Sequence, residues 1–133
     1  MLNKLHAPNL GLLLLRIALG ACVIFHGIAK IKGGIGGVKG MLSGAGLPEF
    51  IGYGVYLGEF IAPIMIILGI FTRFASLILI GTCFTILYLA FSDNIFELLA
   101  KTGGLKAEIV YLYLGGAFCL LFSGGGKFVI KAD

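Results

Sequence analysis

Charged side chains are scarce in this chain. Asp, Glu, Lys and Arg make up 12% of its 133 residues, whereas about 25% is usual for a water-soluble domain. Hydrophobic residues account for 59% of the chain, and the mean hydropathy is +1.10. These values exclude an ordinary soluble protein and predict one integral membrane domain over residues 1–133.

The few charges that are present leave a formal net charge of +4. Most of the basic residues stand at the ends of apolar runs, where a membrane protein meets anionic lipid headgroups. We therefore expect the lipid bilayer, and not a nucleic acid, to be the partner of this positive charge. Basic residues are denser near the termini and in the short turn at 71–73 than in the longer loops of the opposite side, which favours cytoplasmic termini.

Cysteine and histidine are too sparse to build a metal centre. The three cysteines, Cys22, Cys83 and Cys119, lie in separate apolar runs without a CxxC spacing, so a zinc or iron–sulfur site is not expected. His26 is the only histidine inside an apolar run, which excludes a haem held by two histidines of one chain. We predict small packing roles for the cysteines and no covalently bound cofactor.

Four apolar runs predict the fold. They cover residues 10–29, 51–70, 74–91 and 107–122, and the first three approach the ~20 residues that a bilayer requires. No strand pattern is present, and an isolated sheet cannot satisfy its backbone in lipid. The predicted fold class is all-α: an antiparallel four-helix transmembrane bundle.

The link between the first two runs is rich in glycine. Gly36, Gly40 and Gly44 repeat at the spacing that lets a helix press its backbone against another element. A flexible interfacial loop is the alternative, since glycine disfavours helix by up to ~1 kcal/mol per residue. We favour a short interfacial or partly re-entrant segment.

One acid lies near the middle of the second run. Glu59 is ~12 Å from the start of that helix at 1.5 Å per residue, and an ionisable group at such depth usually has a partner or a function. Pro63 stands four residues later and cannot donate an N–H to the Glu59 carbonyl. The sequence therefore predicts an open backbone and a bend at the buried acid.

Depth along the helices indicates which ionisable groups can meet. If the helices run antiparallel, His26, Glu59 and Glu108 share one half of the membrane, with Arg16 beneath them. One arginine cannot neutralise two acids, so a proton on Glu59 or His26 is expected unless Lys30 or another lysine reaches in. One interpretation is an Arg16–Glu59 tie that holds two helices together.

The functional interpretation is a pocket open to lipid with a proton donor and acceptor. Glu59 and His26 are its candidate catalytic residues. The candidate substrate-binding residues are Arg16, Lys30, Glu108, Phe25, Tyr53 and Tyr56. Such a pocket suits a quinone, whose ring stacks on aromatic side chains and whose oxygens need hydrogen bonds and protons.

A series of short motifs runs nearly the length of the chain. They are Leu-Arg-Ile-Ala-Leu-Gly at 15–20, Phe-His-Gly at 25–27 with Lys30, Gly-Leu-Pro at 46–48, Gly-Glu at 58–59, Leu-Gly-Ile-Phe-Thr-Arg at 68–73 and Gly-Gly-Gly-Lys at 124–127. With these motifs the chain resembles the DoxX family of small membrane proteins. The resemblance implies a four-helix protein of the prokaryotic cytoplasmic membrane. Family members have been linked to thiosulfate:quinone oxidoreduction, quinone resistance and oxidative-stress complexes.

Three functions follow as hypotheses. The first is a membrane redox component that binds a quinone or similar lipophilic molecule and receives electrons from a partner oxidoreductase. The second is a structural or assembly subunit whose buried charges join helices. The third is a small transporter, which would need broken helices and, with only four spans, a homo-oligomer. The sequence favours the first.

Overall fold

The computed structural model describes residues 5–92 and 95–133, and within them it is helical. The elements are α1 (Pro8–Gly33), α2 (Gly36–Gly44), η2 (Glu49–Tyr53), α3 (Gly54–Tyr56), η3 (Leu57–Ile61), α4 (Ala62–Leu68), α5 (Thr72–Phe91) and α6 (Glu108–Ser123). The segments from η2 to α4 follow one another without a break and form one helical rod, Glu49–Leu68. No strand forms in the described ranges, which contain two isolated β-bridges. The predicted all-helical class is confirmed.

Three helices are long and apolar enough to cross a membrane: Pro8–Gly33, Glu49–Leu68 and Thr72–Phe91. The fourth apolar helix, Glu108–Ser123, has 16 residues and is shorter. The observed bounds differ from the predicted ones by one or two residues at most ends. The exception is α1, which continues to Gly33 because Lys30 and Lys32 complement the negative end of the helix dipole.

The second helix ends two residues earlier than predicted. Gly69 adopts φ +74°, a left-handed conformation that glycine accepts without strain, and its N–H caps the helix by donating to Met65 O. The chain then turns directly into α5. The glycine-rich link contains the helix α2 and is not a flexible loop there; the buried side chain of this helix is Leu42. Its predicted interfacial or partly re-entrant position stays a prediction.

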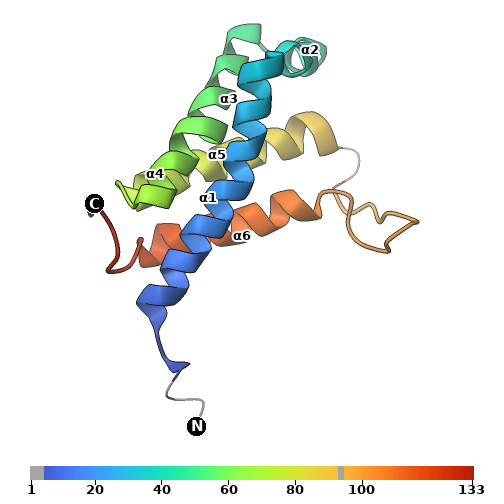
Figure 1. The fold of residues 1–133 in the computed structure, drawn as a ribbon. Coiled ribbons are helices and arrows are strands. Elements are labelled where there is room, and N and C mark those ends of the chain that lie inside the picture. The colour runs from blue at the N-terminus through green and yellow to red at the C-terminus, as the bar shows by residue number, and fades with distance from the viewer. Residues whose placement is uncertain (1–4, 93–94) are drawn as a thin grey trace.

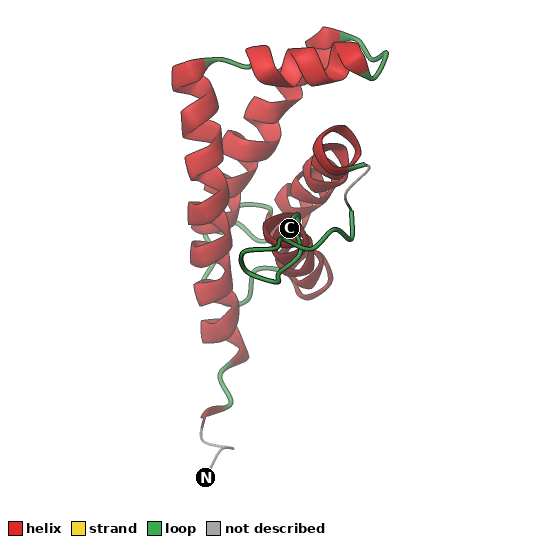
Figure 2. Ribbon diagram, turned by 90° about the vertical axis from the view of Figure 1, so that its right-hand side faces the viewer, coloured by secondary structure: helices red, strands yellow, loops and turns green. Residues whose placement is uncertain are grey.

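The four long helical segments pack as two pairs. α1 lies along α4 and η3, and α5 pairs with α6 as a hairpin. The hairpin crosses the first pair at a steep inclination instead of lying along it (Figure 1). In Figure 2 α1 runs the length of the view while α5 and α6 are seen nearly end-on. α2 lies across the end of the first pair.

The hydrophobic core forms where the two pairs cross. Its most completely buried side chains come from all the long segments: Val23, Ala62, Ile66, Ala75, Leu79, Cys83, Ala117 and Leu120. Glycines allow the helices to approach closely, both where the two pairs cross and within the first pair. A Cβ at Gly58 would overlap the side chain of Thr82 on α5, and a Cβ at Gly27 would overlap the Glu59 carbonyl.

The Glu59 carbonyl, to which Pro63 cannot donate an N–H, therefore lies against Gly27 of α1. Just before Pro63 the backbone widens into the π-helical turn Leu57–Ile61, in which the N–H of Ala62 donates to Leu57 O. A π-turn often occurs at functional sites because it displaces a side chain from the regular helical position. Here the displaced stretch contains Glu59.

Candidate functional site

An apolar cavity of about 610 Å³ lies between the two helix pairs. Its walls come from α1, α2, the Glu49–Leu68 rod, α5 and the start of α6. The cavity exists because the hairpin crosses the first pair near one end, so that α5 and the rod diverge towards α2 (Figure 1). Most of the wall surface is apolar, as in pockets for lipophilic molecules.

Glu59 is the acid of this cavity. Glu59 is 5% exposed, and its carboxylate forms an ion pair with Lys30. Lys30 Nζ lies 3.0 Å from Oε1 and 2.7 Å from Oε2. The Lys30 side chain is 27% exposed, so one partner is buried and the other reaches the edge of the cavity. The pair joins α1 to the π-helical turn and neutralises a charge that would otherwise be costly in lipid.

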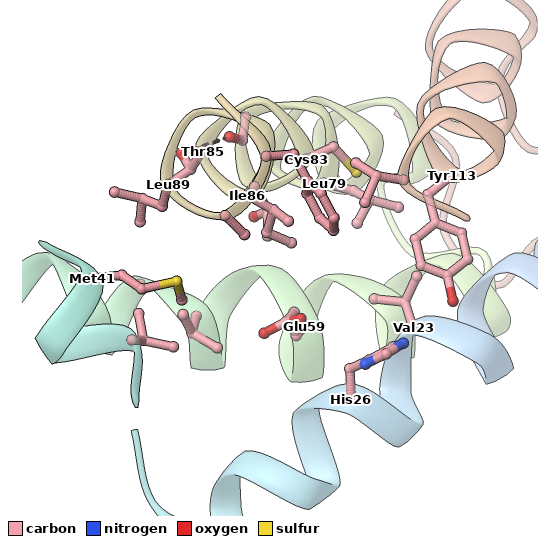
Figure 3. A pocket seen from close by; sticks show the side chains of 18 of the residues that line it. Val23, His26, Met41, Glu59, Leu79, Cys83, Thr85, Ile86, Leu89 and Tyr113 are labelled. Carbon is pink, nitrogen blue, oxygen red and sulfur yellow. Dashed lines mark hydrogen bonds between the residues drawn. The ribbon is translucent and has the colours of Figure 1, made fainter. Parts of the chain in front are cut away.

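His26 stands one turn before Lys30 on the same face of α1 and also lines the cavity. Its ring meets Tyr113 of α6 edge-to-face, with centroids 6.3 Å apart at 75°. Figure 3 places the Glu59 carboxyl group between His26 and the side chains of α5, with Met41 of α2 at the opposite end. The imidazole and the carboxylate therefore share one apolar space.

α5 supplies the wall opposite Glu59. Thr82, Cys83, Thr85 and Ile86 line the cavity from consecutive turns, and Thr82 and Thr85 donate their hydroxyls to carbonyls of their own helix. Satisfying these hydroxyls internally leaves the α5 wall largely apolar. Lys106, just before α6, adds a second lysine to the lining.

Arg16 does not belong to this cavity, and it does not pair with Glu59 as one interpretation required. It is 1% exposed, and its guanidinium donates to four carbonyls: Ile66 at 2.9 Å, Ile67 at 3.1 Å, Gly125 at 3.0 Å and Phe128 at 2.6 Å. Two of these carbonyls, those of Ile66 and Ile67, belong to the last turn of α4, where helical donors run out; Ile66 O also accepts the N–H of Gly69 at 3.3 Å. Arg16 thus ties α1 to α4 and to the segment after α6.

The other expected ligands lie outside the cavity. Phe25 is 69% exposed on the outer side of α1, and Glu108 is exposed in the first turn of α6. Tyr53 is 56% exposed, stacks at a tilt on Tyr56 and accepts a hydrogen bond from Lys39 Nζ at 3.1 Å. That hydrogen bond raises the pKa of Lys39 and fastens α2 to η2.

Of the expected residues, the structure brings together Glu59, His26 and Lys30. Sequence reasoning missed the α5 wall, because that helix carries few ionisable groups. The spacing Leu79, Cys83 and Ile86 on one face was a usable signal. In the described ranges no group of three His, Cys, Asp or Glu side chains is placed to hold a metal ion.

Comparison with known proteins adds three findings. The family model described as DoxX matches residues 11–92. A curated Bacillus subtilis protein, "Putative oxidoreductase CatD", is 32% identical in an alignment of 82 residues; the alignment covers 59% of this chain and 60% of that protein. The match thus spans less than two thirds of that relative's length. No solved structure matches the chain significantly.

Proposed function

Because the chain belongs to the DoxX family, we propose that this multi-pass membrane protein is a redox component that binds a quinone, or a similar lipophilic molecule, in the Glu59 cavity. The four apolar helices, packed as two crossing pairs (Figure 1), then lie in the prokaryotic cytoplasmic membrane, with cytoplasmic termini. The single observation that supports this most strongly is a buried carboxylate and its lysine in an otherwise apolar cavity.

The dimensions of the cavity favour a small, lipid-soluble ligand. At about 610 Å³ it falls within the ~300–1,000 Å³ usual for small-molecule sites. An apolar wall binds rings and isoprenoid carbons through van der Waals contacts. It gives a sugar or a nucleotide almost no hydrogen-bond partners.

The polar groups suit the oxygens of a quinone. The Lys30 ammonium has three donors, two of which its contacts with Glu59 use, and the remaining one is available to a quinone carbonyl. His26 lies on the same wall, and its imidazole can donate or accept a hydrogen bond. Reduction of a quinone takes up two electrons and two protons, so Glu59 and His26 are the proton-handling candidates.

The electrons must come from elsewhere, because no resident redox group is implied by the residues of this site. We propose a partner oxidoreductase as their source. The name of the Bacillus subtilis relative, "Putative oxidoreductase CatD", is in keeping with a redox role. A second copy of the chain can also complete the assembly in the membrane.

A structural role is the second candidate, and one observation favours it. The Lys30–Glu59 pair bridges α1 and the π-helical turn, so the same charges can serve to join helices. In that case loss of Glu59 lowers stability without any effect on a bound molecule.

A titration with a short-chain quinone separates the two. Purified protein in detergent is titrated with decylubiquinone, and binding is followed by the quenching of tyrosine fluorescence. We expect Glu59→Gln to weaken binding at least tenfold and Glu49→Gln, which changes an exposed acid outside the cavity, to bind as wild type. Folded Glu59→Gln protein with wild-type affinity would contradict the proposed site.

A further inference from the structure

A second cavity, of about 240 Å³, lies where α5 begins and α6 ends. It is lined by Thr72 and Arg73 of α5, by the glycine-rich residues 123–126 and by Asp133. Its lining consists mainly of backbone and polar side chains, in contrast to the Glu59 cavity. The start of α5 and the end of α6 meet here, so the cavity lies at a membrane surface if both helices span the bilayer as proposed above.

The start of α5 already holds a carboxylate in this cavity. The backbone N–H groups of Arg73 and Phe74 both donate to Asp133 Oδ2, at 2.8 and 3.2 Å. The first N–H groups of a 20-residue helix have no helical acceptor, and the helix dipole favours a negative charge beside them. The position is therefore built to accept the oxygen of an anion.

A buried hydroxyl points to a larger ligand than one carboxylate. Thr72 is 2% exposed and lines the cavity, and its Oγ1 has no hydrogen-bond partner among the described residues. Burying a hydroxyl in this state is costly, and such atoms usually signal a missing partner. An anion with a second oxygen beside the helix start supplies that partner.

The surroundings provide charge and space for such an anion. A Cβ at Gly124 would lie 3.2 Å from Arg73 Nε, so the guanidinium lies against the glycine segment. Gly124 and Gly126 adopt φ +75° and +83°, which side-chain-bearing residues rarely do. Lys127 follows directly. The recess thus combines a helix start, an arginine and a backbone without side chains, which together are typical of phosphate sites.

We propose that this recess binds a phosphate-type oxyanion, either inorganic phosphate or the phosphate of a lipid headgroup. The Asp133 carboxylate is an intramolecular competitor that occupies the helix start until the ligand displaces it. The two N–H groups, the Thr72 hydroxyl and the Arg73 guanidinium are the ligand's donors. This site is independent of the Glu59 cavity and of what that cavity binds.

The test measures the shift of the thermal unfolding midpoint in dodecyl maltoside. Wild type, Asp133→Asn and Thr72→Val are each titrated with inorganic phosphate at constant ionic strength, and separately with phosphatidylglycerol or diacylglycerol. We expect Asp133→Asn to bind about tenfold tighter, because the competing negative charge is gone. We expect Thr72→Val to bind about tenfold weaker, through loss of one hydrogen bond to a charged ligand.

The Thr72→Val variant distinguishes a ligand role from a structural one. Since its hydroxyl has no partner in the described protein, the unliganded variant should unfold at the wild-type temperature or above it. Stabilisation by phosphatidylglycerol alone identifies a lipid headgroup, and stabilisation by phosphate alone identifies a soluble anion. Stabilisation by neither, or equal binding by Thr72→Val and wild type, overturns the proposal.

Discussion

Among the described residues, Arg16 has the side chain that donates the most hydrogen bonds. Replacing it by methionine removes these donors and keeps an apolar side chain of similar length. The guanidinium donates four hydrogen bonds to carbonyls of α4 and of the segment after α6. Methionine occupies similar volume but leaves all four carbonyls without this donor. The variant therefore loses hydrogen bonds between α1 and the other segments but keeps most of its van der Waals packing.

The four bonds set the size of the expected effect. Interhelical hydrogen bonds in membrane proteins average about 0.6 kcal/mol, and bonds to charged groups in soluble proteins contribute about 1.5 kcal/mol or more. Four bonds therefore predict a loss of about 2 to 6 kcal/mol in the free energy of unfolding. Arg16→Lys should fall between wild type and Arg16→Met, because one ammonium cannot reach all four carbonyls.

The assay is unfolding by SDS in mixed micelles, followed by circular dichroism. Lys101→Met is the control, because Lys101 is an exposed basic residue outside the helices. An Arg16→Met protein within about 0.5 kcal/mol of wild type, the usual range for a neutral surface change, would refute this account of Arg16. Folded Arg16→Lys should still bind quinone, since Arg16 does not line the cavity.

Two further predictions concern the contact between α1 and the π-helical turn. Gly27→Ala should lower the free energy of unfolding by about 1–3 kcal/mol, because the added methyl group overpacks against the Glu59 carbonyl. Gly33→Ala is the control and should not destabilise the protein, because the space around Gly33 is open. Equal effects of the two changes in SDS unfolding would argue against the close approach of α1 to the π-helical turn. Lys30→Met should cost about 1–3 kcal/mol by leaving the Glu59 carboxylate unpaired, and adding Glu59→Gln should recover part of that loss. An additive double mutant would mean that the pair is not coupled.

The apolar runs predicted the helices well because span length and hydrophobicity are local properties. The start of α5 at Thr72 and the end of α6 at Ser123 lie within two residues of expectation. The end of α4 at Leu68 also lies within two residues of expectation, and Gly69 after it is a recognised helix stop. Pro63 indicated a disturbed backbone, but not that it would take the form of a π-helical turn.

The site was predicted less completely, for a geometric reason. Depth along a helix placed His26, Glu59 and Glu108 in one half of the membrane. The structure brings His26 and Glu59 together with Lys30 in one cavity and leaves Glu108 exposed outside it. Depth does not give the crossing of the two helix pairs, on which the α5 wall depends. Arg16 was misassigned because its ligands are backbone carbonyls, which no pattern of side chains reveals.

The central claim is that the Glu59 cavity holds a lipophilic redox molecule. Its most direct test is mass spectrometry of organic-solvent extracts from wild-type, Glu59→Gln and Glu49→Gln proteins purified in the same detergent. The account predicts a quinone retained by wild type and Glu49→Gln and lost from Glu59→Gln at equal protein recovery. Phospholipid alone in all three extracts would contradict it and favour the role of the Lys30–Glu59 pair as an interhelical tie.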